Sequence, residues 1–253
     1  MRARQKALPL ALTFTMVLLL GRTTPAQGPT ADIATTVVDR VVTAHGRQWA
    51  TGEVLDSVAE GKLMLFGLEG PKTTFDLTLL RKGMTRVLRV VHQPAGELRQ
   101  GTDGVNSWES IPGFFTPAAQ GRAMQFLEMQ TTRSIQRLFN HQKEGLKLQD
   151  LGVQDDWRVI EAEDQERKKT RYFIDPDKNL ITKLEFITRE VKDPFSGAMV
   201  PLTDKYVFSD FRLTQGIVTP FKVERFNGGN KLEEMQFNIV RYNSGLKDAD
   251  FRR

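Results

Sequence analysis

The chain of 253 residues contains no cysteine, which excludes disulfide bonds, thiolate catalysis, cysteine metal ligands and a lipid-modified cysteine at a cleavage site. Histidine is scarce as well: His45, His92 and His141 are far apart, and none falls in a spacing typical of a metal site. The sequence also lacks a Gly-x-Ser-x-Gly nucleophile motif and a glycine-rich phosphate loop. We therefore predict no metal, no cofactor and no catalytic residue.

Acidic clusters are the one feature that keeps an enzyme among the hypotheses. Asp155-Asp156 is one cluster, and residues 161–164 form another beside Lys168-Lys169, as is usual at charged hairpin tips. Carboxylate pairs for acid–base chemistry come together only on folding. Nothing in the sequence selects one pair over another, so a hydrolase ranks third among the functions considered.

Residues 1–26 are predicted to be a secretory signal peptide. A basic start precedes an apolar run at residues 11–20, and Thr24-Pro25-Ala26 supplies small residues for cleavage after Ala26. The run is too short to span a membrane comfortably, although an uncleaved anchor is the alternative. We expect a soluble protein of the periplasm without a lipid anchor.

Removal of that segment changes the charge balance. The segment holds four of the 36 Lys and Arg residues and no acid, which leaves 32 against 31 Asp and Glu, a net charge of +1. The isoelectric point of about 9.4 therefore comes largely from the signal peptide. A nearly neutral mature chain gives no indication of nucleic-acid binding.

Residues 27–253 are predicted to form one α+β domain. An apolar stripe predicts a helix over 33–45, with Gly46 as its stop. Thr116-Pro117 is a typical helix start, so a second helix is expected over 119–140. A period of two predicts an antiparallel sheet of about ten or eleven strands, including 84–93, 96–102, 105–111, 157–163, 169–175, 180–190, 203–212, 217–227 and 231–241.

One hairpin in this sheet carries a tryptophan. Asp103-Gly104 is typical of a two-residue type I′ turn, in which both central residues need a positive φ. Trp108 then lies on the returning strand. By itself it is interpreted as a packing anchor rather than a ligand contact.

Every second residue along the strands, one parity of the alternation, is strongly apolar. If the sheet curls, this parity faces its concave side. The residues concerned are Leu63, Leu65, Phe75, Leu77, Leu79, Leu184, Phe186, Phe221, Val223, Met235, Phe237 and Ile239. From periodicity alone an ordinary core is the simpler interpretation, and a groove for an acyl chain is the alternative.

Several motifs in order give the chain a resemblance to the outer-membrane lipoprotein-sorting superfamily, the periplasmic carriers and receptors with the LolA/LolB fold. They span nearly the whole mature chain. They are Val41-Val42-Thr43-Ala44-His45-Gly46, Gly61-Lys62-Leu63, Asp103-Gly104 with Trp108, Tyr172-Phe173-Ile174-Asp175-Pro176-Asp177, Phe208-Ser209-Asp210-Phe211, Pro220-Phe221-Lys222-Val223 and Asn243-Ser244-Gly245-Leu246 with Asp248 and Phe251.

That resemblance implies an incomplete β-barrel with helices as a lid or plug over its concave face. It implies that the apolar parity forms a groove for acyl chains of lipoproteins or lipids, with Met124, Leu127, Ile135 and Leu138 on the lid. It implies partners in the inner and outer membranes, and a basic residue near the barrel mouth in lid control: Arg81, Lys82 or Arg86. The oligomeric state is not predicted.

The departures from the family pattern leave the cargo open. The insert at 192–201 and the long helix expected at 118–140 differ from a minimal carrier. The first hypothesis is a non-catalytic carrier of acyl chains. The second is an interaction or lipid-sensing module on the same fold, which would expose an apolar patch rather than a deep hollow.

Overall fold

The computed structural model describes residues 29–67, 70–192 and 197–252. The predicted signal peptide and its cleavage site lie outside these residues. The helices are α1 (Pro29–His45), α2 (Gln48–Thr51), α3 (Gly121–Thr131) and α4 (Ile135–Phe139), with a 3₁₀ helix η1 (Asp248–Phe251) near the C-terminus. None of the helices described is both long and apolar enough to cross a bilayer.

All the strands of the described residues belong to one antiparallel sheet. In chain order they are β1 (Asp56–Gly67), β2 (Gly70–Lys82), β3 (Arg86–Gln93), β4 (Gly96–Asp103), β5 (Ser107–Ile111), β6 (Phe114–Thr116), β7 (Lys147–Gln154), β8 (Trp157–Glu163), β9 (Lys169–Ile174), β10 (Ile181–Lys192), β11 (Met199–Thr214), β12 (Ile217–Asn227) and β13 (Asn230–Tyr242). The sheet has 13 strands, in the spatial order β6-β5-β4-β3-β2-β1-β13-β12-β11-β10-β9-β8-β7.

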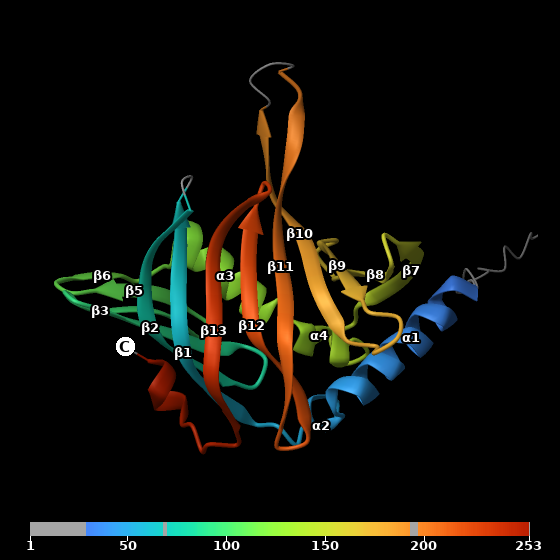
Figure 1. Cartoon of the computed structure of the whole chain (residues 1–253), viewed down its shortest axis with the longest axis horizontal. Helices are drawn as coiled ribbons and strands as arrows, with labels where there is room; N and C mark the ends of the chain where they lie inside the picture. The colour runs from blue at the N-terminus through green and yellow to red at the C-terminus, as the bar shows by residue number, and fades with distance from the viewer. Residues whose placement is uncertain (1–28, 68–69, 193–196, 253) are drawn as a thin grey trace, which may run out of the picture.

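The sheet is curved but not closed, and β6 and β7 form its two edges. Figure 1 shows α3 and α4 lying against one face of the curved sheet. This confirms the predicted α+β fold with an incomplete barrel. The prediction of ten or eleven strands fell short because β6 and β7, at the edges, were not recognised.

The topology places the helices between the two edges. The chain starts in the middle of the sheet at β1 and runs outward strand by strand to β6. It then crosses through α3 and α4 to β7 at the other edge and returns to β13, which pairs with β1. The segment predicted as a lid is therefore the connection between the two edges of the sheet.

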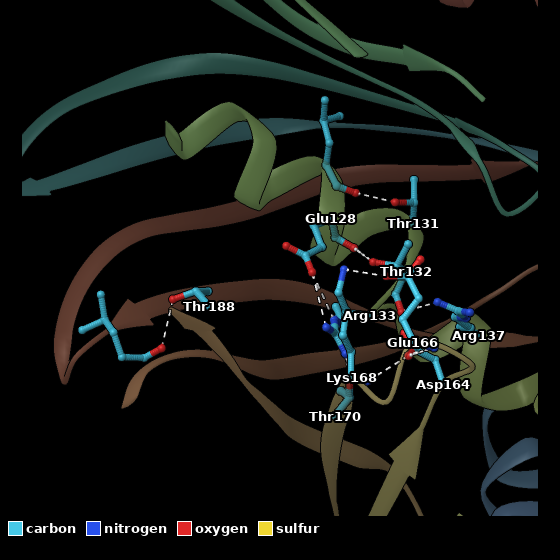
Figure 2. Close-up of polar contacts among 12 residues, drawn as sticks. Glu128, Thr131, Thr132, Arg133, Arg137, Asp164, Glu166, Lys168, Thr170 and Thr188 are labelled. Carbon is cyan, nitrogen blue, oxygen red and sulfur yellow. Dashed lines mark hydrogen bonds and ion pairs between the residues drawn. The ribbon is translucent and has the colours of Figure 1, made fainter. Parts of the chain in front are cut away.

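The predicted helix over 119–140 is wrong in its start and its continuity. Thr116 belongs to the edge strand β6, and α3 begins only at Gly121. The helix ends at Thr131, where the hydroxyls of Thr131 and Thr132 donate to carbonyl oxygens four residues earlier, a contact that favours bending (Figure 2). The hydroxyl of Tyr172, on β9, donates to the carbonyl oxygen of Ser134 and holds the break in place.

The turn at Asp103-Gly104 also differs from its prediction. The paired register ends at Thr102 and Ser107, and the Asp103 N–H still donates to the carbonyl oxygen of Asn106 at 3.2 Å. Gly104 and Val105, rather than Asp103 and Gly104, are therefore at the centre of the turn. The Asp103 carboxylate accepts the backbone N–H groups of Val105 and Asn106, at 2.9 and 2.8 Å. Asp103 itself does not have a positive φ, whereas Gly104 does, at 98°. The aspartate side chain organises this turn, which a type I′ turn does not require.

Gly46 ends α1 as predicted, with φ at 95°. A Cβ there would lie 2.8 Å from the carbonyl oxygen of Gly216, at the β11–β12 turn. Only glycine therefore allows α1 to stop this close to the sheet.

Trp108 lies on the convex face of the sheet. It packs in a small cluster with Leu88, Val90 and Phe251, separate from the main core. Its indole N–H donates to the carbonyl oxygen of Phe251 at 3.2 Å. A Cβ on Gly101, on the neighbouring strand, would lie 2.9 Å from the indole ring. Trp108 fastens the C-terminal η1 to the outside of the sheet.

Candidate functional site

The concave face of the sheet and the helices enclose the main hydrophobic core, and this core contains a cavity of about 110 Å³. Its walls come from α1, α2, α3, α4 and strands of the middle of the sheet. The apolar lining residues are Trp49, Ala59, Leu79, Met129, Ile135, Phe139, Phe208, Ile217, Val218, Pro220, Val223, Met235, Phe237 and Val240. Ligand pockets usually measure about 300–1,000 Å³, so α3 and α4 fill most of this hollow.

Most of the predicted groove residues share this concave side. Eight of them are buried in the main core, namely Leu63, Leu77, Leu184, Phe186, Phe221, Val223, Met235 and Phe237. Leu65, Phe75 and Leu79 pack against it with partial exposure. Leu79, Val223, Met235 and Phe237 reach the cavity itself.

Ile239 does not lie with this set: it is 43% exposed. The register between β1 and β13 shifts at this point, where Glu60 pairs with Ile239 but Gly61 pairs with Phe237. This bulge places an extra residue in β13, and it reverses the parity of the strand. Val240 therefore points into the cavity where the alternation predicted Ile239.

The predicted lid residues also divide into buried and exposed ones. Leu127, Ile135 and Leu138 are buried in the main core, whereas Met124 is 43% exposed on the outer side of α3. Met129 is buried and lines the cavity.

Three buried arginines of the sheet contact α3, and sequence reasoning had missed two of them. Arg81 on β2 donates to the amide oxygen of Gln130. Arg89 on β3 lies over the ring of Phe126, 3.9 Å from its centre. The third, Arg225 on β12, donates to Gln125 at 2.6 Å. Helix α3 is thus held to the sheet by polar as well as apolar contacts.

A sequence signal for these arginines existed. Arg81 follows Leu77 and Leu79 on the apolar parity of its strand, and Arg225 follows Phe221 and Val223. A charged residue in a buried alternation indicates a special environment, because an unpaired charge is costly to bury.

The arginines differ in their charge partners. Arg225 is fully buried and pairs with the equally buried Asp204 at 2.9 Å. Arg89 pairs with Glu233 at 3.0 Å. No carboxylate of the described residues forms an ion pair with Arg81, and its Nη1 has no hydrogen-bond partner among them. Burial lowers the pKa of Arg81 to about 10, so the guanidinium remains charged at neutral pH.

This geometry distinguishes among the three basic residues considered for lid control. Arg81 reaches α3 from inside the hollow. Lys82 and Arg86 instead pair with Asp248 of η1 on the convex side, at 2.8 and 3.3 Å.

His45 lines the cavity as a neutral structural residue. Its Nε2 accepts the backbone N–H of Ile181 at 3.0 Å, and its Nδ1 lies 3.1 Å from the carbonyl oxygen of Val218. These two contacts assign the proton to Nδ1 and tie the end of α1 to β10 and β12. Burial lowers the pKa of His45 to about 4. Within the ranges described, no three His, Asp or Glu side chains come together as a metal site.

No protein-family model and no curated protein sequence matches the chain. Solved structures do share its fold. A proposed outer membrane lipoprotein-sorting protein domain from Vibrio parahaemolyticus matches with a TM-score of 0.59 and 15% identity, over 88% of this chain and 97% of its own. A DUF1329 family protein from Desulfovibrio piger gives 0.60 and 15%, over 87% and 97%.

A LolA superfamily protein from Nitrosomonas europaea gives a TM-score of 0.58 and 14% identity, over 87% of this chain and 97% of its own. At such identities the likeness concerns the fold. The chain therefore has the fold that the resemblance in sequence implied, over most of its length.

Proposed function

We propose that the chain is an exported, non-enzymatic carrier that holds the acyl chain of a lipoprotein or lipid between the concave face of the sheet and α3–α4. The observation that carries the proposal is the cavity lined by Leu79, Val223, Met235 and Phe237 beneath a helical lid. The fold shared with a LolA superfamily protein and a lipoprotein-sorting domain supports it.

Loading needs the lid to move. A cavity of about 110 Å³ lies below the usual range for a ligand pocket, so a long chain fits only if α3 and α4 shift outward. Burial of each CH₂ group contributes about 0.8 kcal/mol, so a long chain can offset the lid contacts that it replaces. The polar contact between Arg81 and Gln130 is the one we assign to lid control, because it is made inside the hollow without a counter-ion.

The tryptophans provide a matched test. Trp49 lines the cavity, whereas Trp108 lies in the convex cluster. Two single-tryptophan proteins are made: Trp108→Phe with Trp157→Phe keeps Trp49, and Trp49→Phe with Trp157→Phe keeps Trp108. Titration with a long-chain fatty acid should shift the emission of Trp49 and leave that of Trp108 unchanged.

A second measurement addresses the natural cargo. The protein purified from the periplasm of an expressing cell is extracted and analysed by mass spectrometry, where an acylated molecule in stoichiometric amount is expected. Absence of such a molecule, together with equal or no response of the two tryptophans, would contradict the carrier and favour an interaction module on the same fold.

Export is part of the proposal. The basic start and apolar run of residues 1–26 support secretion, with cleavage after Ala26, release to the periplasm and contact with components of the inner and outer membranes during transfer. N-terminal sequencing of the exported protein should begin at Gln27.

A further inference from the structure

A cleft opens where β9 and β10 diverge. The two strands pair from Ile181 with Ile174 to Glu185 with Arg171. Beyond that point β10 continues to Lys192, paired with β11. The space between them measures about 530 Å³ and carries five cationic side chains, Arg133, Arg167, Lys168, Lys169 and Arg171. We call this space the basic cleft.

The cations of the basic cleft outnumber its acids. Two carboxylates line it, Glu161 and Glu185. Glu161 already binds Lys169 at 2.6 Å and Arg171 at 3.0 Å, and Glu185 lies 3.4 Å from Lys183. Lys168 pairs with Glu166 at 3.0 Å, and Lys169 also lies 4.0 Å from Glu163, both acids being just outside the lining. Arg167 is therefore the lining cation that has no carboxylate partner among the described residues.

Arg133 forms a buried wall of the basic cleft. It comes from the break between α3 and α4 and is only 3% exposed. Its guanidinium donates to Thr170 at 3.1 Å, and its contacts with the Glu128 carboxylate are long, at 3.4 Å (Figure 2). A tighter oxygen ligand than Glu128 can therefore improve the environment of this cation.

The β8–β9 turn holds further cations in place. The Asp164 carboxylate accepts the backbone N–H groups of Glu166 and Lys168, both at 2.9 Å. Arg167 takes a positive φ of 62° in this turn, and among the described contacts its side chain has no charge partner. The backbone thus presents Arg167 and Lys168 on a defined turn rather than on a loose loop.

Apolar side chains flank the basic cleft. Phe186 lies 5.3 Å from the Arg133 guanidinium, and Ile187 beside it is 59% exposed. Figure 1 shows the β10–β11 hairpin extending beyond the neighbouring strands. On this hairpin Met199 and Val200 are also exposed. Cations beside exposed aliphatic side chains match the boundary between phosphates and acyl chains of a bilayer.

We propose that the basic cleft binds the phosphate of an anionic phospholipid in a membrane surface, with Ile187, Met199 and Val200 entering the interface beside it. The unpaired Arg167 and the long Arg133–Glu128 contacts favour an anionic over a zwitterionic surface, and the apolar flank favours a lipid over a free phosphate. This site lies apart from the acyl cavity, and it can bind a membrane whether or not that cavity carries cargo.

The test uses the mature full-length protein and vesicles of phosphatidylcholine with or without phosphatidylglycerol. Binding in sedimentation should require phosphatidylglycerol and weaken with salt. The variant Arg167→Gln with Lys168→Gln removes two exposed cations of the basic cleft. Because each cation near an anionic surface is worth about 1 kcal/mol, the partition coefficient should fall by at least about tenfold.

A matched control removes the same charge elsewhere. Lys62→Gln with Lys178→Gln takes two exposed lysines from surface ion pairs outside the basic cleft. It should bind vesicles within about twofold of the original protein, since surface pairs contribute little to folding. Ile187→Ser with Val200→Ser should weaken vesicle binding with no change in its salt dependence.

Three results would overturn the proposal. They are equal loss in the cleft and control variants, equal binding to both vesicle types, and binding of glycerol phosphate in solution without binding of phosphatidylglycerol vesicles. Failure here is distinguishable from failure of the carrier function, because the tryptophan titration uses soluble fatty acid and no membrane.

Discussion

The two faces of the sheet bury their side chains in different ways. On the convex face, Trp108, Leu88, Val90 and Phe251 form a small cluster in which the indole N–H has its partner. The partly buried Arg99 lies over the Trp108 ring, 6.0 Å from its centre. On the concave face, a much larger core contains a cavity and buried arginines. The convex cluster is thus ordinary packing. The concave side retains a cavity and buried arginines, neither of which a stable core requires.

The largest expected effect tests the convex cluster. Trp108→Ala should lower the free energy of unfolding by about 3–5 kcal/mol, because it removes a buried aromatic side chain and leaves a cavity. Urea denaturation measures this loss. Fatty-acid affinity, measured where the variant is still folded, should stay unchanged, and a parallel loss of affinity would show that the two faces are not independent.

Arg225 tests the paired charge on the concave face. Arg225→Met leaves Asp204 buried without its cation, which should cost about 3–5 kcal/mol of stability. The double variant Arg225→Met with Asp204→Leu should recover most of that loss. If the double variant is as unstable as the single one, the charge pair is not the reason for the effect.

His45 gives the concave face a pH dependence. Its pKa is lowered from 6.5 to about 4 in the folded protein, so the unfolded chain binds the proton first as the pH falls. The contribution of neutral His45 is complete above pH 6.5 and is progressively lost as the pH falls toward 4. At one pKa unit per 1.36 kcal/mol, about 2 kcal/mol should disappear between pH 6.5 and 5.

Unfolding in urea at both pH values measures this contribution. The range from pH 6.5 to 5 stays above the pH at which most carboxylates of the unfolded chain titrate. His45→Gln should be less stable than the original protein at pH 7 but should vary less between pH 6.5 and 5. An unchanged slope in this variant would assign the pH dependence to other groups.

Arg81 should give the smallest effect on stability. Arg81→Met removes a buried cation that has no carboxylate partner, so it leaves no charge uncompensated and frees only the Gln130 amide oxygen. The free energy of unfolding should change by less than about 1 kcal/mol, in contrast to Arg225→Met. Acyl binding or release should change nevertheless, as measured by the Trp49 emission on rapid mixing with fatty acid. A large loss of stability would mean that Arg81 is structural.

Local patterns in the sequence predicted much of the fold. The alternation that placed Leu63, Leu77 and Phe237 on one face held, because residues of one parity stay on one face of a regular strand. It failed at Ile239, where the bulge depends on how β13 meets β1, a strand far away in the sequence. The short β6 and the break after Thr131 were missed because edge pairing and side-chain hydrogen bonds overrode local propensity.

The polar part of the site was harder to predict. Arg89 and Glu233 are 144 residues apart in sequence, and Arg225 and Gln125 are 100 apart. No local pattern links such partners, since only the meeting of β1 with β13 and the crossing of α3 bring them together. The basic cleft depends likewise on the point at which β9 and β10 stop pairing.

The route of the chain constrains how any lid could open. The α3–α4 segment leaves one edge strand, β6, and enters the opposite one, β7, so it is fastened at both ends like a strap across a bowl. A segment attached at both ends cannot open by rotating about a single hinge, as a loop with one free end could. The segment can move outward only by bending away from the sheet or by drawing the two edges of the sheet together. Entry of a ligand into the concave side should therefore shift both edges of the sheet, including the side that carries β9 and β10.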